Sequence, residues 1–228
     1  MIFKVIDTER IPIKIWMDDL EEGALRQAKN AANLPFAFRH IAIMPDAHAG
    51  YGVPIGSVLA TTEIVVPNAV GVDIGCGMCA AKLDTKIPEQ KSLSTIIREI
   101  KKKVPVGFSW QKRPQEWEGF HRAPDVDIIN ENLEKATYQL GTLGGGNHFI
   151  EIQKGSDERL WVMVHCGSRN FGLKIANHYH GRAKALCDKR SDVPARDLSF
   201  LPLGSGKEGD EYLAAMNFAI AFAKANRD

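Results

Sequence analysis

The segment from Ile41 to Lys82 constrains the fold most, because short apolar runs alternate there with turns rich in glycine and proline. These runs predict strands at residues 41–44, 57–62, 64–66 and 78–83. At the centre stands GVDIGCG (71–77), in which the carboxylate of Asp73 and the thiol of Cys76 are three residues apart. Glycine lets a backbone turn sharply or approach a ligand closely, so this turn is a candidate metal-binding segment. The alternative is that Cys76 is simply a small buried hydrophobe.

Helix and strand patterns are mixed along the rest of the chain. Apolar and polar residues alternate roughly over residues 2–16, which predicts one or two edge strands. Apolar residues recur at helical spacing over 20–32, 93–104, 128–140 and from 211 to the end. The acidic run DDLEE at 18–22 predicts a variant of the capping box ahead of the first of these helices.

The overall composition is that of an ordinary globular protein with little net charge. The net charge is +1, so an anionic partner would have to bind a local patch rather than respond to the field of the whole molecule. The four cysteines form no disulfide framework and are typical of a reducing compartment. No window approaches 18 uninterrupted apolar residues, and the N-terminus is too charged for a signal peptide. We therefore expect a cytoplasmic chain without a membrane span.

Two histidines stand at element boundaries, as Asp73 and Cys76 do. His148 opens an apolar strand after a triple glycine, and His165 closes another strand just before CGSR. A carboxylate, a thiolate and two imidazoles suit a borderline divalent metal such as Zn, Mn, Fe or Co, and the thiolate could bridge two ions. Either histidine alone is more simply a hydrogen-bonded core residue, but the four residues together favour a metal site.

The triple glycine at 144–146 would allow backbone N–H groups to approach an anion. No Lys-Ser/Thr pair follows, so the segment is not a P-loop. Asn147 and Glu151 offer hydrogen-bonding groups beside His148, and together they could hold a nucleotide. The alternative is a tight turn in which Asn147 adopts a left-handed conformation.

Aromatic and basic residues are interleaved between Val104 and Pro124, and three lysines precede them at 101–103. The interleaved residues are Phe108, Trp110, Lys112, Arg113, Trp117, Phe120, His121 and Arg122. Such a loop could stack on and pair with single-stranded nucleic acid, or it could be an excursion anchored by its aromatic rings. The lysines are most simply the solvated last turn of a helix, and phosphate binding is the less favoured interpretation.

Four motifs together resemble one known family. MPDAHAGYGVPIGSV, GVDIGCGM, LGTLGGGNHFIEI and VHCGSRNFG occur in this order, and they are similar to those of the RtcB family of RNA-splicing ligases. The resemblance covers essentially the whole chain. It implies an α+β fold peculiar to the family, with mixed and antiparallel sheets flanked by helices. It also implies two Mn²⁺ ions, GTP as cofactor, and the joining of an RNA 3′-phosphate or 2′,3′-cyclic phosphate to a 5′-hydroxyl in tRNA splicing or RNA repair.

The resemblance also assigns roles to residues of this chain. Asp73, Cys76 and His148 would hold one Mn²⁺, and Cys76 and His165 would hold the other, with Cys76 bridging. The residues implied to contact GTP are Asn147, His148, Phe149, Ile150 and Glu151. The choice of Mn²⁺ over Zn²⁺ rests on the resemblance, because a thiolate by itself favours the softer ion.

The chain also departs from the family pattern. Family members are considerably longer, and the histidine that becomes guanylylated lies downstream in a segment that this chain lacks. We therefore expect residues 1–228 to be the N-terminal portion of a single catalytic domain, inactive by itself. Asp46 and His48 would lie near the site as catalytic candidates, with roles that the resemblance does not fix. Cys166 stands where the family often has serine, which predicts a second thiol near one ion.

Two other functions are consistent with the same residues. The first is a metal-dependent phosphoesterase or nuclease that uses these ligands without a nucleotide intermediate. The second is a non-catalytic module that binds metal or RNA. Dependence on GTP separates the ligase from the first alternative, and the effect of Cys76→Ala on RNA binding separates it from the second.

Overall fold

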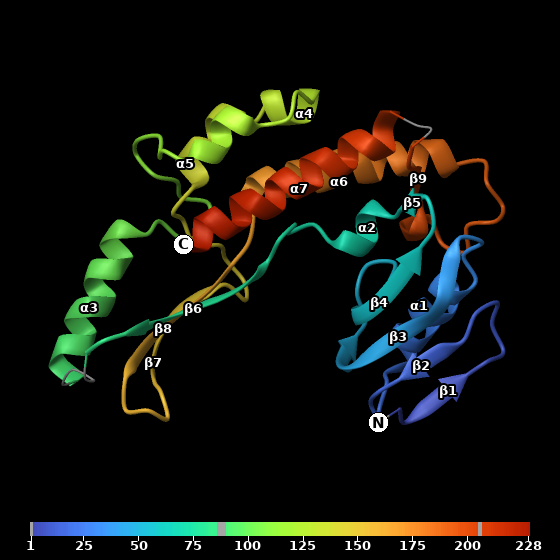
Figure 1. The fold of residues 1–228 in the computed structure, drawn as a ribbon, viewed down its shortest axis with the longest axis horizontal. Helices are drawn as coiled ribbons and strands as arrows, with labels where there is room; N and C mark the ends of the chain where they lie inside the picture. Colours follow the sequence, from blue (N-terminus) through green and yellow to red (C-terminus); the bar gives the residue numbers. More distant parts are fainter. Residues whose placement is uncertain (1, 86–89, 205–206) are drawn as a thin grey trace. The chain divides into compact units, whose positions relative to one another are not determined.

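A computed structural model of the chain describes residues 2–85, 90–204 and 207–228. The chain divides into two compact units (Figure 1). Unit 1 consists of Met1–Val72 and Ala176–Leu213, and unit 2 of Asp73–Ile175 and Ala214–Asp228. Both units contain sheet and helix, so the α+β class is confirmed. That residues 1–228 act as a single catalytic domain stays a prediction.

Unit 1 is built on a four-stranded mixed sheet in the order β1-β2-β3-β4. Its strands are β1 (Lys4–Ile6), β2 (Ile13–Ile15), β3 (Ala37–His48) and β4 (Ile55–Thr61). β2 runs parallel to β3, and the other pairs are antiparallel. The prediction of edge strands is correct for β1 but wrong for β2. β2 lies inside the sheet, between β1 and β3. Its Ile13 and Ile15 belong to the hydrophobic core and are 0% and 4% exposed.

Helix α1 (Glu22–Ala32) packs against this sheet through buried alanines at positions 24, 28, 31 and 32. The predicted capping box is wrong, because the N-cap residue is Glu21 and its side chain makes no capping hydrogen bond. Its carboxylate instead accepts the backbone N–H of Ala49. The smaller elements of unit 1 are β5 (Ile64–Val65), α2 (Pro67–Val70), η2 (Arg196–Leu198) and β9 (Leu201–Pro202).

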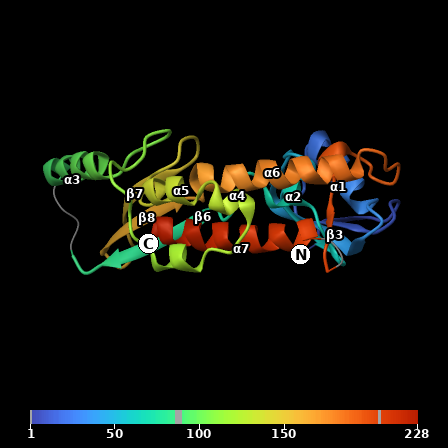
Figure 2. The same ribbon diagram turned by 90° about the horizontal axis from the view of Figure 1, so that it is seen from above.

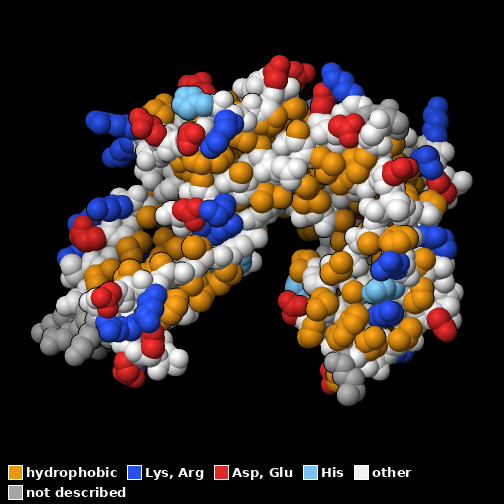
Figure 3. All heavy atoms as spheres, in the orientation of Figure 1, with side chains coloured by type: hydrophobic (Ala, Val, Ile, Leu, Met, Phe, Trp, Pro, Cys, Tyr) orange, Lys and Arg blue, Asp and Glu red, His pale blue; other side chains and the backbone are white. Residues whose placement is uncertain are grey.

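Unit 2 is built on an antiparallel sheet in the order β6-β8-β7. The strands are β6 (Gly77–Leu83), β7 (Phe149–Lys154) and β8 (Leu160–Cys166). Met78 pairs with His165, and His165 pairs with Phe149, so these three side chains lie on one face of the sheet. Figure 3 shows hydrophobic side chains among charged ones in the region of this sheet.

The helical elements that complete the chain are α3 (Gln90–Lys103), η1 (Glu118–Arg122), α4 (Asp127–Asn130), α5 (Leu133–Gln139), α6 (Arg169–Cys187) and α7 (Lys207–Arg227). The single helix predicted over 128–140 is two short helices, separated at Glu131–Asn132. α6 and α7 lie side by side (Figure 2), and each contributes residues to both units. In the described part of the chain, no helix is long and apolar enough to cross a membrane.

An aromatic cluster joins the loop before α4 to the helices of unit 2. Trp117 lies 5.6 Å from Phe218 and 5.2 Å from Phe120, measured between ring centroids. Phe222 lies 6.0 Å from Trp117 and 5.3 Å from Phe171. The interpretation of residues 104–124 as a loop anchored by its aromatics is therefore correct for the second half of that loop.

Candidate metal centre

The four predicted ligands all lie in unit 2, at one end of its sheet. Asp73 and Cys76 lie in the turn before β6, His148 directly precedes β7, and His165 is the last but one residue of β8. Cross-strand pairing of Gly77 with Cys166 brings these ends together. Cys76 thus meets histidines that are 72 and 89 residues away in the sequence.

Cys76 is the common neighbour of both imidazoles. Its Sγ lies 3.1 Å from Nε2 of His165 and 3.4 Å from Nε2 of His148. The two rings are nearly perpendicular, with centroids 5.3 Å apart. One ligand atom from each of the three residues lies within 4.8 Å of the others. A thiolate in this position has the placement that a bridging ligand needs.

Asp73 completes the cluster on the side of His148. Its Oδ2 lies 2.9 Å from Nε2 of His148, and its Oδ1 accepts the backbone N–H of Ser168 at 3.1 Å. Oδ2 is buried, yet within the described residues it has no aligned hydrogen-bond partner. Oδ2 and Nε2 are therefore close without being aligned as acceptor and donor, a geometry that suits two ligands of one cation.

A backbone carbonyl fixes the orientation of His165. Nδ1 of His165 lies 3.1 Å from the carbonyl oxygen of Asn147. A carbonyl only accepts, so Nδ1 carries the proton and Nε2 presents its lone pair toward Cys76. This outer contact is the kind that fixes the tautomer and orientation of histidine ligands in metal sites.

Two glycines leave the space in which ligand side chains lie. A Cβ at Gly144 would lie 1.7 Å from Nδ1 of His148, and a Cβ at Gly167 would lie 2.2 Å from Oδ2 of Asp73. Any side chain at either position would displace the ligand. These glycines belong to the GGG and HCGSR segments, so the motifs contribute space as well as ligands.

The electrostatics of the cluster favour a cation. Burial, and next the negative charge of Asp73, raises the pKa of the Cys76 thiol to about 12. A divalent ion among these atoms would replace the thiol proton and stabilise the thiolate. The orphaned carboxylate oxygen, the thiol and the two ring nitrogens therefore fit a borderline divalent metal such as Mn, Fe, Co or Zn.

Cys166 lies behind His148 and does not belong to the group around Cys76. Its side chain is fully buried, and its Sγ lies 3.9 Å from Nδ1 of His148. The Nε2 atom of the same ring faces Cys76. The thiol that the sequence predicted near an ion thus contacts the outer edge of a ligand ring.

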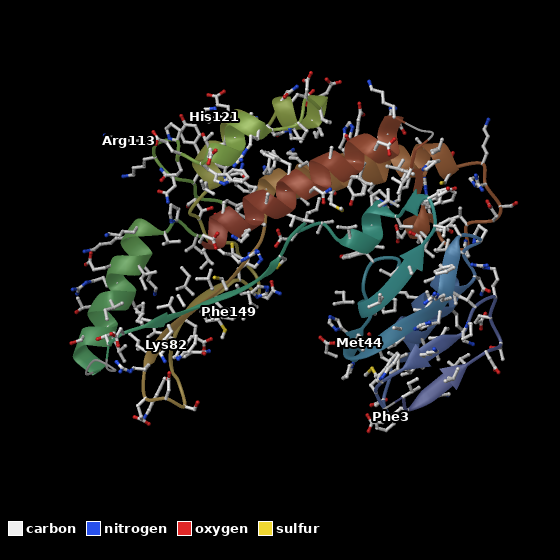
Figure 4. All side chains as sticks on the ribbon, in the orientation of Figure 1. Phe3, Met44, Lys82, Arg113, His121 and Phe149 are labelled. Atoms are coloured by element: carbon white, nitrogen blue, oxygen red, sulfur yellow. The ribbon has the colours of Figure 1, made fainter. Side chains whose placement is uncertain are left out.

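The residues predicted to contact GTP are split between the two faces of β7. Phe149 and Glu151 pair with His165 and Met163, so they share the face of the metal cluster. Ile150 pairs with Val164 on the opposite face. Asn147 is exposed, and its carbonyl oxygen binds His165. Figure 4 labels Phe149 on its strand.

Asp46 and His48 belong to unit 1, whereas the cluster belongs to unit 2. Both are exposed near the end of β3, and Nδ1 of His48 lies 2.9 Å from the carbonyl oxygen of Asp46. Gln27 on α1 fixes the following turn through two hydrogen bonds to the backbone of Gly50, at 2.6 and 2.9 Å. A catalytic role for Asp46 or His48 stays a prediction.

Sequence reasoning missed Arg169, which organises the loops around the cluster. It begins α6 with a φ of +58°, a left-handed conformation that costs energy for a residue with a side chain. Its guanidinium donates to Oγ1 of Thr142 at 3.0 Å and to the carbonyl oxygen of Gly107 at 2.7 Å. Burial lowers the pKa of Arg169. The available signal is the HCGSR motif, in which Arg169 follows the predicted ligand His165 by four residues.

The fold and the cluster define an α+β protein with a candidate metal centre of mixed sulfur, nitrogen and oxygen ligands. The sequence profile of the family described as tRNA-splicing ligase RtcB matches residues 27–123 and 115–228. The chain therefore belongs to the RtcB family, and the resemblance drawn from its motifs is confirmed.

Individual relatives support the same assignment. The RNA-splicing ligase RtcB of Escherichia coli K12 is 37% identical over 252 residues, a match that covers 100% of this chain and 61% of that protein. The tRNA-splicing ligase RtcB of Nanoarchaeum equitans is 32% identical over 276 residues, covering 95% of this chain and 57% of the relative. The corresponding protein of Thermococcus kodakarensis is 30% identical, with 96% and 57% covered. The chain thus spans about three fifths of the length of these relatives.

Proposed function

We propose that this chain supplies metal ligands to a GTP- and Mn²⁺-dependent RNA ligase of the cytoplasm. The reaction joins RNA 3′-phosphate or 2′,3′-cyclic phosphate ends to 5′-hydroxyl ends, as in tRNA splicing or RNA repair. Family membership and the names of the relatives support the reaction class. The observation that carries the proposal is the convergence of Cys76 on the Nε2 atoms of both His148 and His165.

In this proposal Asp73, Cys76 and His148 hold one Mn²⁺, and Cys76 and His165 hold the second. Bound Mn²⁺ would neutralise phosphate charge and help to align the reacting oxygens. The residues of the chain keep the ligands in place. Ser168 holds the carboxylate of Asp73 through its N–H, and the carbonyl of Asn147 holds His165 with Nε2 facing inward.

GTP would bind along the face of the sheet that carries His165. Phe149 offers a ring for contact with the base, and the exposed carboxylate of Glu151 offers an acceptor. Nε2 of Gln153 donates to that carboxylate at 2.8 Å, which fixes its orientation. The guanylylated histidine that the family implies would be contributed from outside residues 1–228.

RNA would contact the first half of the loop at 104–124. Phe108 is fully exposed and Trp110 is 40% exposed, in contrast to the packed rings of Trp117 and Phe120. The backbone N–H of Gly107 donates to the carbonyl of Leu143 at 2.9 Å, so this turn is attached to the loop that leads to His148. Lys112 and Arg113 are exposed beside the aromatics, and Figure 4 labels Arg113. Exposed rings beside cationic side chains suit an unpaired RNA end.

Metal binding by the chain tests whether Cys76 bridges two ions between His148 and His165. After incubation with Mn²⁺ and dialysis, the wild type should retain two ions, whereas Cys76→Ala should lose tight binding of both. Cys79→Ala is the matched control, because Cys79 lies on β6 and pairs with Val164, so its side chain is on the face opposite to that of His165. Wild-type metal content in Cys76→Ala would contradict the bridging role.

Ligation itself is tested on the product of the complete reading frame to which this sequence belongs. That protein should join 3′-phosphate and 5′-hydroxyl RNA ends only with both Mn²⁺ and GTP. Hydrolysis of RNA ends with metal but without GTP would instead support the phosphoesterase. The 228-residue chain, incubated with labelled GTP, should form no covalent adduct. An adduct on this chain would overturn the assignment of the nucleophile to a segment outside it.

A further inference from the structure

The last turn of α7 contacts the loop that carries His148. The side-chain amide of Asn226 both accepts a hydrogen bond from the backbone of Thr142 and donates one to it. The N–H of Thr142 donates to Oδ1 at 3.2 Å, and Nδ2 donates to the carbonyl oxygen of Thr142 at 3.0 Å. Thr142 precedes the triple glycine, so this pair of bonds fixes the start of the His148 loop.

The next residue, Arg227, contacts the other two ligand-bearing segments. Its Nη1 donates to the carbonyl oxygens of Gly75 and Cys166, each at 2.7 Å. Gly75 immediately precedes Cys76, and Cys166 immediately follows His165. A single guanidinium thus connects the backbones beside the thiol and beside one imidazole.

The backbone of the Cys76 turn also packs closely on α7. Gly75 has a φ of +74°, and a Cβ built there would lie 2.9 Å from Cβ of Ala223 and 3.0 Å from Cα of Ile220. The turn therefore approaches the helix as closely as a glycine allows. This approach places the carbonyl of Gly75 within reach of Arg227.

A further contact leads from α7 to the outer edge of His148. Nδ2 of Asn226 lies 3.3 Å from Sγ of Cys166, and that sulfur lies 3.9 Å from Nδ1 of His148. Cys166 therefore stands between the amide of Asn226 and the imidazole ring. The end of α7 reaches all three ligand-bearing segments through side chains of two consecutive residues.

We propose that Asn226 and Arg227 form a clamp that positions Cys76, His148 and His165 for metal binding. Neither residue is among the candidate ligands, so both would act as positioning residues. The proposal rests on the proposed metal-binding function, but it also makes a claim about the metal-free chain. The alternative is that the two residues only form the last turn of α7. In that case the three ligand-bearing segments would stay equally well ordered when either side chain is removed.

Hydrogen exchange of the metal-free chain tests the clamp independently of any metal. Asn226→Ala should accelerate amide exchange chiefly in the segments 142–148 and 165–168, and Arg227→Ala chiefly in the segments 73–77 and 165–168. The matched control is Lys224→Ala, which removes only an exposed ion pair with Asp228 in the same helical turn. Unchanged exchange in all three segments would overturn the clamp.

Binding of Co²⁺ alone, used as a spectroscopic probe, tests the effect on ligand geometry. Both clamp variants should weaken Co²⁺ binding by about 10- to 100-fold, the usual effect of removing an outer partner of a metal ligand. They should also weaken the thiolate-to-cobalt absorption band at saturation. Arg227→Lys keeps a cationic donor and should recover part of both signals. Ile129→Val, which removes a methylene group from the buried core at α4, controls for general loss of stability.

The outcomes separate the clamp from the proposed function. Accelerated exchange together with wild-type Co²⁺ affinity and absorption in the clamp variants would overturn the positioning role. A third outcome is that the wild-type chain binds no Co²⁺ while the variants still show accelerated exchange. The clamp would then be supported as a structural contact that orders these segments, and the proposed metal-binding function would be contradicted. Equal losses of affinity in Ile129→Val and the clamp variants would also count against the clamp.

Discussion

Gly144 and Gly145 are neighbours with opposite surroundings. A Cβ at Gly144 would overlap Nδ1 of His148, at 1.7 Å, whereas a Cβ at Gly145 would meet nothing within 4 Å. Gly144→Ala should therefore displace His148, lower the Mn²⁺ affinity of the chain by about 10- to 100-fold and destabilise unit 2 by about 1–3 kcal/mol through overpacking. Titration calorimetry with Mn²⁺ and thermal denaturation measure the two effects.

Gly145→Ala is the control for this prediction. It changes the same loop by the same methyl group, but into open space, so metal affinity should remain that of the wild type. If both alanine variants lost affinity equally, flexibility of the triple glycine rather than space for His148 would be the cause. Such a result would contradict the steric argument.

The ligands could be recognised from the sequence, but the residues that position them could not. Asp73, Cys76, His148 and His165 carry metal-binding groups at predicted element boundaries, and such residue types stand out in any chain. Asn226 is an ordinary residue near the end of helix α7. Its contact with Thr142 spans 84 residues and follows from tertiary packing alone.

Among the elements, α7 shows where helical periodicity succeeds and where it fails. The helical spacing of apolar residues from 211 on places Tyr212, Ala219 and Ile220 on one face, which predicts that they are buried, and the first two are fully buried. Ile220 is 42% exposed, whereas Phe218 and Phe222 are buried against Trp117. The aromatic cluster determines which face of the helix turns inward, and no local pattern encodes that partner.

Strands were easier to predict than their positions within a sheet. The four strands predicted between 41 and 83 appear as β3 to β6, because apolar runs between glycine turns have few other solutions. The interior position of β2 could not be predicted, since it depends on parallel pairing with β3, whose register aligns Ile13 with Ile41. The pairing joins segments on either side of α1.

The part of α7 in unit 1 leads to a prediction about alkaline stability. Burial raises the pKa of Tyr212, whose hydroxyl lies 3.4 Å from the carbonyl oxygen of Pro67. An unfolded tyrosine titrates near pH 10. Below that pH the tyrosine is neutral in both states, and its contribution to stability is complete. As the pH rises above about 10, the unfolded state ionises first, so the free energy of unfolding should fall.

Denaturant unfolding from about pH 8 to about pH 11, which is from about two units below to about one unit above the pKa of a free tyrosine, measures this effect. Tyr212→Phe removes the ionisable group, so it should lose less stability over this range than the wild type does. At pH 8 it should cost only about 0.5–1.5 kcal/mol, the value of one hydrogen bond. Tyr51→Phe is the control, because Tyr51 is 77% exposed. A wild-type alkaline profile in Tyr212→Phe would refute the assignment to Tyr212.

At the scale of the whole molecule, charge balance limits how the proposed RNA partner would bind. A net charge of +1 gives little long-range attraction for a polyanion, so affinity has to arise where cations are concentrated. The last turn of α3 contributes Lys101, Lys102 and Lys103, and the following loop contributes Lys112 and Arg113. Exposed Phe108 lies between these two groups in the sequence. The exposed cations and the exposed ring of this segment together predict two separable components of the proposed RNA binding.

The two components can be distinguished by their dependence on salt. Each phosphate contact with single-stranded RNA contributes about 0.7 to the slope of log affinity against log salt, so Lys112→Ala should reduce that slope by about 0.7. Phe108→Ala should instead weaken binding by about 1–3 kcal/mol, the value of one stacked base, without changing the slope. Fluorescence anisotropy of a short labelled RNA at several salt concentrations measures both quantities. Lys189→Ala, an exposed lysine of unit 1, is the control. An equal change of slope in that control would show that RNA binds the surface without preference for this loop.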